Sequence, residues 1–260
     1  MSEVKSATRV MHILNLLSEL PHGLTLSEIS EELNLPKSSS HEILHAMVEK
    51  NFLQLDSKKY RIGLKVFEIG QAASRNLDLL QAVRPPLKWA GEKLGQVVQF
   101  AILDKTEVVY LSKMQFRQTI TLESRVGTRL PAHATALGKA MLSLLPEEVI
   151  IERYADMEFQ HFTSNSIGSI DELMANLREA RATSFAEDHA EYTEGVFCIS
   201  VPIPNFHDKT FGAISISMSE DAWNRIDRKQ TACILESAGK KISESMTVQF
   251  NNKYRGLKVV

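Results

Sequence analysis

The first 62 residues place apolar side chains at helical spacing in three consecutive segments. One stripe lies within residues 6–20, and two more follow between residues 25 and 48. The stripes consist of Val10, Ile13, Leu14 and Leu17, then Leu26, Ile29 and Leu33, then Ile43, Leu44, Met47 and Val48. This periodicity predicts three amphipathic helices that share a small core.

Local signals set the ends of the second and third helices. Thr25 is a good N-cap, and Glu28, three residues later, completes a capping box. Pro36 suits the first turn of the third helix, because its missing amide hydrogen costs nothing there. The helix pair predicts a helix-turn-helix.

Two short strand patterns follow at 52–55 and 59–62, around Asp56, Ser57 and Lys58. The order of three helices and a hairpin is that of a winged helix-turn-helix, so residues 1–62 are predicted to bind DNA. The outward face of the third helix and the basic hairpin can reach phosphates and base edges. The expected contacts are Thr25, Lys37, Ser38, Ser39, Ser40, His41, Glu42, His45, Lys58, Lys59 and Arg61. For the third helix alone, the alternative is the solvated face of an ordinary helical hairpin.

Beyond the hairpin, the pattern predicts a linker helix over 63–76 and a mixed domain over 77–250, with a tail at 251–260. Strands are expected at 97–103, 107–114, 119–124, 196–203 and 211–217. Helices are expected at 77–94, interrupted by Pro85 and Pro86, and at 135–145, 147–155, 170–184 and 222–250. Strands grouped apart from helices indicate an α+β domain built on an antiparallel sheet.

Composition indicates the cellular compartment of the protein more clearly than its function. The formal net charge of -2 argues against a generally basic, non-specific nucleic-acid binder. Residues 1–62 hold seven Lys and Arg against eight Asp and Glu, so only local charge in the hairpin favours phosphate contact. The two cysteines show no metal spacing, and neither a membrane-length apolar run nor a signal peptide is found, so we expect a cytoplasmic protein without disulfides.

Three features of the second domain suggest a small-ligand site. Thr135 is an N-cap that would leave the amides of Ala136 and Leu137 available to an anion. The alternative is an ordinary capped helix that has the same sequence pattern and binds no ligand. Small polar groups interrupt two apolar strands at Cys198, Ser200, Ser215 and Ser217. An acidic loop precedes them, and one of its carboxylates could accept a hydrogen bond from a ligand; its members are Glu187, Asp188, Glu191 and Glu194.

From about residue 6 to 245, the chain resembles the IclR family of bacterial transcription regulators. The resemblance rests on the ordered motifs GLTLSEISEELNLPKSS, YRIG, RVGTRLPAHATALGKAML, EDHAEYTEGVFCISVPI and FGAISIS. It implies a winged helix-turn-helix, a linker helix and a GAF-like effector-binding domain. It also implies a homodimer or dimer of dimers on a roughly palindromic operator.

The resemblance places effector contacts at Ala136, Leu137, Asp188, Cys198, Ser215 and Ser217. Two positions depart from the family pattern. Leu137 stands where smaller residues are common, which would narrow the pocket. Glu42 stands where an arginine is common; it cannot bind phosphate, although it could accept from a cytosine amino group. The expected effector is a hydroxy-, keto-, sugar or aromatic acid, with no cofactor.

Three other interpretations compete with the regulator. An enzyme could use Cys198, His133 and Asp188 as nucleophile, base and orienting group, although no sequence feature brings them together. The second domain could instead be a dimerisation scaffold without a ligand. A metal site at His161, His189 and His207 is disfavoured, because these residues lack ligand spacing.

Overall fold

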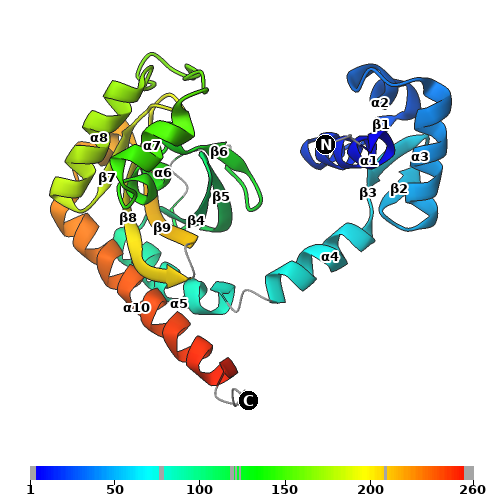
Figure 1. Ribbon diagram of the computed structural model, residues 1–260. Helices are drawn as coiled ribbons and strands as arrows, with labels where there is room; N and C mark the ends of the chain where they lie inside the picture. Colours follow the sequence, from blue (N-terminus) through cyan, green and yellow to red (C-terminus); the bar gives the residue numbers. More distant parts are fainter. Residues whose placement is uncertain are drawn as a thin grey trace. The chain divides into compact units, whose positions relative to one another are not determined.

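The computed structural model describes residues 4–75, 79–117, 120, 122, 124–207 and 210–254. The chain divides into two compact units, residues 1–77 and 78–260 (Figure 1). In order, the N-terminal unit contains α1 (Lys5–Glu19), β1 (Leu24–Thr25), α2 (Leu26–Glu32), α3 (Lys37–Glu49), β2 (Leu53–Asp56), β3 (Lys59–Ile62) and α4 (Leu64–Arg75).

The N-terminal unit is a winged helix-turn-helix. Helices α1, α2 and α3 pack with the β2–β3 hairpin around one core, formed by Ile13, Leu17, Ile29, Leu44, Met47, Leu53 and Tyr60. The two-residue strand β1, which the sequence did not predict, pairs with β3 and gives the antiparallel order β1-β3-β2. Both residues of the hairpin turn, Ser57 and Lys58, have positive φ, as a two-residue type I′ turn requires.

The predicted helix starts need one correction. The capping box at α2 is confirmed, since Thr25 Oγ1 accepts from the Glu28 amide and Glu28 Oε2 accepts from the Thr25 amide. Pro36, however, is the extended N-cap of α3 and does not lie in its first turn. Its φ of -60° suits both positions, so the fixed ring torsion alone could not distinguish them.

The C-terminal unit is built on a six-stranded antiparallel sheet of order β6-β5-β4-β9-β8-β7. Its strands are β4 (Val97–Asp104), β5 (Glu107–Met114), β6 (Arg129–Pro131), β7 (Ala186–His189), β8 (Val196–His207) and β9 (Thr210–Ser219). Its helices are α5 (Leu79–Leu94), the 3-10 turn η1 (Ala132–Ala134), α6 (Ala136–Leu142), α7 (Glu147–Tyr154), α8 (Ile170–Thr183), α9 (Glu220–Trp223) and α10 (Arg228–Tyr254).

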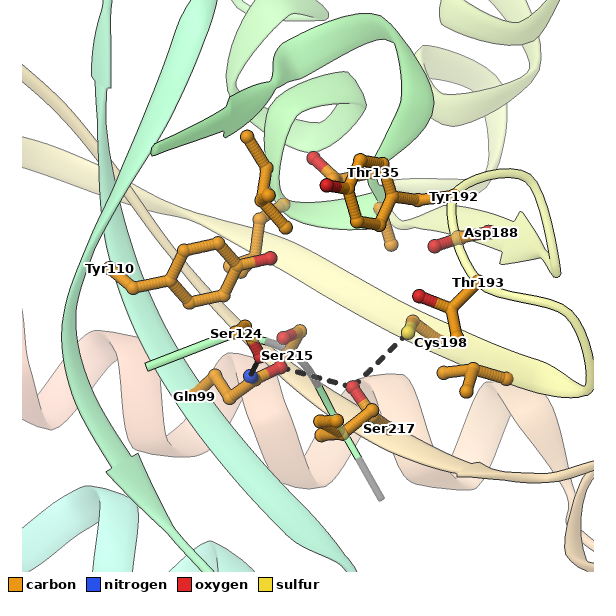
Figure 2. Close-up of a pocket in the computed structure, with 15 residues that line it drawn as sticks. Gln99, Tyr110, Ser124, Thr135, Asp188, Tyr192, Thr193, Cys198, Ser215 and Ser217 are labelled. Atoms are coloured by element: carbon orange, nitrogen blue, oxygen red, sulfur yellow. Dashed lines mark hydrogen bonds between the residues drawn. The ribbon is translucent and has the colours of Figure 1, made fainter. Parts of the chain in front are cut away.

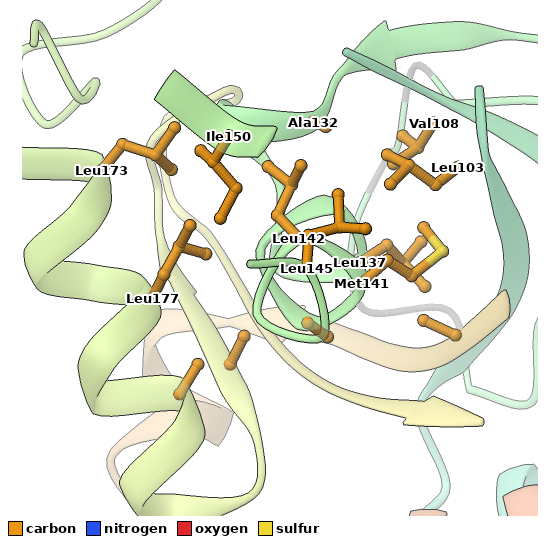
Figure 3. Packing of buried hydrophobic residues seen from close by; sticks show 14 of the residues in the cluster. Leu103, Val108, Ala132, Leu137, Met141, Leu142, Leu145, Ile150, Leu173 and Leu177 are labelled. Atoms are coloured by element: carbon orange, nitrogen blue, oxygen red, sulfur yellow. The ribbon is translucent and has the colours of Figure 1, made fainter. Parts of the chain in front are cut away.

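Helices cover both faces of this sheet. On one face, α5 and α10 pack against the apolar side chains of β4, β8 and β9. On the other, α6, α7 and α8 form a second cluster with β4, β5 and β6 (Figure 3). The polar residues of the central strands therefore lie on the α6 side, because side chains alternate along a strand.

The structure changes several predicted boundaries in this unit. Helix α5 continues through Pro85 and Pro86; Pro86 and Leu87 are buried, and this burial offsets the backbone hydrogen bonds lost at the prolines. The predicted helix at 222–250 is two helices, since Asp227 accepts from the Gln230 amide and starts α10 separately.

The predicted strand at 119–124 falls partly outside the described residues, namely at 119, 121 and 123; its described positions are not in a strand, and β6 lies further along. Strand β7 was predicted to be loop. Helix α10 extends four residues into the predicted tail, of which residues 255–260 are outside the described part. Within the described residues, no helix combines the length and apolarity needed to cross a membrane.

Candidate functional site

Of the eleven predicted DNA-contact residues, seven lie on α3 and three in the β2–β3 hairpin, while Thr25 caps the start of α2. On α3, the side chains of Lys37, Ser38, His41, Glu42 and His45 are exposed. The His41 and His45 rings stack at 6.3 Å between centroids, so the two imidazoles form one surface strip. Lys37 and Ser38, at the start of α3, are also exposed to solvent, as insertion of the helix into a major groove requires.

Ser40 does not belong to this surface, and its prediction as a DNA contact is wrong. Its side chain is fully buried, and its hydroxyl has no hydrogen-bond partner within the described structure. The reason is the helical period: Ser40 lies four and seven residues before Leu44 and Met47, on the stripe that faces the core.

An arginine from α1 contacts the predicted DNA-binding surface, which the sequence did not indicate. Arg9 Nη1 donates to Ser39 Oγ at 2.9 Å, and Ser39 is half-buried. In the hairpin, Lys58 and Arg61 are exposed, while Lys59 is half-buried. Arg61 also lies 3.7 Å from Asp56, a surface pair too exposed to hold the guanidinium away from a phosphate.

The six predicted effector contacts all line one cavity in the C-terminal unit (Figure 2). The cavity itself has a volume of about 30 Å³, within about 430 Å³ of non-atom space that includes open solvent. The described lining consists of Gln99, Tyr110, Leu122, Ser124, Leu130, Thr135, Ala136, Leu137, Asp188, Tyr192, Thr193, Val196, Cys198, Ser215 and Ser217. Figure 2 shows Gln99 and Tyr110 on one side, facing Asp188, Thr193 and Cys198 on the other.

Strand register explains why residues distant in sequence meet here. Ser217 of β9 lies opposite Cys198 of β8, and Ser215 lies opposite Gln99 of β4. Asp188 of β7 pairs with Cys198 in turn. Paired residues of neighbouring strands share a face, so four strands present these side chains to the same space.

A chain of hydrogen bonds crosses the cavity floor. Gln99 Nε2 donates to Ser124 Oγ at 2.6 Å, and Ser217 Oγ donates to Gln99 Oε1 at 3.0 Å. Cys198 Sγ lies 3.1 Å from Ser217 Oγ. Because Ser217 spends its proton on Gln99, its oxygen can only accept from the thiol or from a ligand.

The start of α6 closes one end of the cavity. Thr135 Oγ1 accepts from the Gly138 amide at 3.1 Å, which leaves the amides of Ala136 and Leu137 without a capping partner from that hydroxyl. A Cβ on Gly138 would collide with the backbone of Ala132, so glycine allows η1 to lie against α6. Leu137 and Met141 pack into the hydrophobic cluster shown in Figure 3. The segment is therefore a packed, capped helix, and its first residues still line the cavity, where their amides could bind an anion.

Burial controls the ionisable groups of the cavity. It raises the pKa of Asp188 to about 7, assisted by the nearby Glu191 charge and opposed by Lys139. Burial likewise raises the pKa of the Cys198 thiol and of the Tyr110 hydroxyl well above their usual values. Near neutral pH, Cys198 and Tyr110 are therefore uncharged hydrogen-bonding groups.

The residues considered for catalysis do not form a nucleophile and base. His133 is absent from the described cavity lining, and its ring packs against Tyr154 and Phe159. Burial lowers the pKa of His133 and raises the pKa of Cys198, which disfavours the thiolate that a cysteine nucleophile needs. Asp188 and Cys198 do lie next to each other, as residues that line the cavity.

His189, considered as a metal ligand, instead lies 2.7 Å from Glu187 and packs edge-on against Trp223. Among the described residues, no group of three or more His, Cys, Asp or Glu could hold a metal ion.

Sequence reasoning missed several lining residues, above all Gln99, Tyr110, Ser124 and Thr193. Gln99 had a usable signal, since it is a single amide within the apolar strand VVQFAIL. The same reasoning had identified Ser215 and Ser217. Ser124 and Thr193 lie in irregular segments, where periodicity gives no indication of direction.

A winged helix-turn-helix unit joined to an α+β unit with a polar cavity defines a DNA-binding transcriptional regulator. Comparison with known families agrees. The model for "Bacterial transcriptional regulator IclR C-terminal" matches residues 71–244, and that for "IclR helix-turn-helix domain" matches residues 6–57. The chain belongs to the IclR family, whose members bind operator DNA and small-molecule effectors.

Individual relatives match along most of their length. The HTH-type transcriptional regulator XynR of Escherichia coli (strain K12) is 30% identical over 251 residues, which cover 94% of this chain and 97% of XynR. The regulator KdgR of Dickeya chrysanthemi is 29% identical over 245 residues, covering 94% and 80%. An IclR homolog from Microbacterium hydrocarbonoxydans, solved with 4-hydroxybenzoate, has a TM-score of 0.81 at 22% identity, covering 94% and 99%.

Proposed function

We propose that the cavity binds a small carboxylate metabolite and that this binding controls the affinity of the protein for its operator. The observation that carries the proposal is the convergence of hydroxyl, thiol, carboxyl and amide groups from separate elements on one largely buried space. Concave sites that combine apolar walls with convergent polar groups are typical of small-molecule sites. The 4-hydroxybenzoate in the Microbacterium hydrocarbonoxydans structure supports a ligand of similar size.

In this proposal, the amides of Ala136 and Leu137 bind the ligand carboxylate at the start of α6. The chain of Gln99, Ser217 and Cys198 at the floor binds a ligand hydroxyl or keto oxygen at the other end. Apolar walls at Leu122, Leu130, Leu137 and Val196 complete the space. Hydroxy-, keto-, sugar and aromatic acids share this distribution of polar ends.

On the DNA side, we assign residues 1–62 to operator binding, 63–76 to the linker and 77–250 to effector binding, in a cytoplasmic protein. The start of α3, with Lys37, Ser38 and His41, enters the major groove, and the hairpin contacts phosphates. A homodimer or dimer of dimers matches a roughly palindromic operator. Glu42 accepts from a cytosine amino group or faces solvent.

Linkage supplies the mechanism. A ligand that binds more tightly to one dimer geometry shifts the population towards that geometry and so changes the spacing of the two recognition helices. A coupling of about 1–3 kcal/mol would change operator affinity by roughly five- to 150-fold.

The first experiment is a thermal-shift screen against pyruvate, gluconate, 4-hydroxybenzoate and related acids. Ligand at one hundred times its Kd adds about 2.7 kcal/mol to stability, which raises the unfolding temperature measurably. Ser217→Ala should abolish this rise, because Gln99 loses its donor and the ligand its acceptor. Ser237→Ala, on the exposed side of α10, is the matched control and should keep it.

Silence across the whole panel would contradict a carboxylate effector and favour a ligand-free dimerisation scaffold. A rise that persists in Ser217→Ala would place the ligand somewhere other than this cavity.

A further inference from the structure

A buried ion pair lies beside the cavity without being part of its lining. Lys139 of α6 and Glu191 of the β7–β8 loop expose 1% and 6% of their side chains. Lys139 Nζ lies 2.5 and 2.7 Å from the two Glu191 oxygens and donates to Asn176 Oδ1 at 3.1 Å. Burying two charges is costly, so such a pair needs a compensating role or complete hydrogen bonding.

Glu191 joins the elements that form one side of the cavity. Its amide donates to Asp188 Oδ1 at 2.8 Å, and its carboxylate accepts hydrogen bonds from Lys139 Nζ. Its carbonyl oxygen accepts from Ser166 Oγ at 2.7 Å and from Thr163 Oγ1 at 3.2 Å. One residue therefore fixes Asp188 relative to both α6 and the segment before α8.

The charges around the cavity are unusual for an anion site. Among the described lining residues, Asp188 is the single ionisable carboxyl group, and there is no Lys, Arg or His. Lys139 is neutralised by Glu191, and Lys113 donates to the backbone carbonyls of Leu122 and Ser124. A ligand carboxylate would therefore enter a buried space beside Asp188 with no unpaired lining cation.

Two carboxylates in such a space repel, so one of them must carry a proton. The charged groups around Asp188 determine which of the two carboxyl groups carries the proton. Glu191 adds negative charge beside it, Lys139 opposes this from α6, and the His189 ring, next in the chain, is turned to Glu187. Cys198 and Tyr110 face it uncharged, since burial raises the pKa of both. Burial and Glu191 together raise the pKa of Asp188 to about 7.

We propose that the Glu191–Lys139 pair positions Asp188 in the effector site, where Asp188 carries a proton and donates to the ligand, so that a monocarboxylate binds together with one proton. Asp188 Oδ1 accepts from the Glu191 amide, so the proton lies on Oδ2. The inference rests on the proposed function. It narrows the effector class to monocarboxylates, because a second ligand carboxylate would find no second proton.

The first test measures affinity by calorimetry between pH 6 and 8.5 with pyruvate, gluconate and 4-hydroxybenzoate, and with terephthalate as the dicarboxylate partner of 4-hydroxybenzoate. In the wild type, monocarboxylate affinity should fall above pH 7 and approach about tenfold per pH unit. Asp188→Asn should make affinity independent of pH, because an amide donates without titrating. Terephthalate should bind more weakly than 4-hydroxybenzoate throughout.

Glu191→Gln removes the neighbouring negative charge, so the loss of affinity should begin lower by roughly one pH unit. Glu194→Gln, an exposed change in the same loop, should match the wild type. A wild-type affinity that is flat with pH, or an unchanged midpoint in Glu191→Gln, would overturn the inference while leaving the effector site intact.

A second measurement judges the pair without any ligand. Carbon-13 NMR of carboxyl-labelled aspartate, assigned by loss of the signal in Asp188→Asn, follows the titration of Asp188 in the ligand-free protein. A midpoint near 7 that falls in Glu191→Gln is expected. An ordinary aspartate midpoint near 4 would overturn the inference. If no probe binds at any pH, the carboxylate effector fails, and this titration still decides the role of the pair.

Discussion

At the scale of single residues, the cavity shows how burial changes chemistry. Ser217, Gln99 and Cys198 are ordinary polar groups that become directional when buried, because each donor must find an acceptor. Asp188 is the extreme case, a carboxyl group whose charge the surroundings disfavour.

The raised pKa of Asp188 makes stability depend on pH with a definite sign. The folded state holds the proton up to about pH 7 and the unfolded chain only to about 3.8, so this stabilising contribution is complete below pH 3.8 and is lost as pH rises to 7. Relative to Asp188→Asn, the wild type should lose roughly 1.4 kcal/mol per pH unit between pH 5 and 7, then level off.

Urea unfolding followed by tryptophan fluorescence measures this loss, since Trp89 and Trp223 both belong to the C-terminal unit. Asp221→Asn, at an exposed position of α9, is the control and should run parallel to the wild type. A constant difference between the wild type and Asp188→Asn across pH 5–7 would show that Asp188 is ionised in the folded protein.

At the scale of elements, the proposed recognition surface consists of α3 and the hairpin. Lys37→Ala should weaken operator binding and lower the slope of log affinity against log salt by about one, because one phosphate contact is lost. Fluorescence anisotropy at several salt concentrations, with DNA selected from a random pool, measures both effects. Lys88→Ala, an exposed lysine of α5, is the matched control; equal losses in the two variants would contradict a role for α3.

Elements with strong periodicity were the predictable part of the fold. Helices α2, α3, α7 and α8 follow the apolar pattern closely, whereas β7 has the sequence AEDH, whose charges conceal an edge strand. Ser40 was misassigned although its spacing to Leu44 indicated the core face. The N-cap, the polar positions in apolar strands and the acidic loop had indicated the predicted cavity residues, and the motif resemblance selected Asp188 among the loop carboxylates. Gln99 and Tyr110 join them through strand pairing, which local sequence does not encode.

At the scale of the whole molecule, the proposed function couples the binding reactions of the two units. Each unit has its own core, so variants in one should leave intrinsic binding by the other unchanged. Coupling is reciprocal: if the effector changes operator affinity by a factor, the operator changes effector affinity by the same factor.

The most direct test is therefore a thermodynamic cycle. Operator affinity is measured by anisotropy with and without a saturating monocarboxylate from the screen, and effector affinity by calorimetry with and without operator. The proposed linkage predicts a change of roughly five- to 150-fold in both affinities, equal in both directions and absent in Ser217→Ala. An effector that binds the free and DNA-bound protein equally well would contradict it.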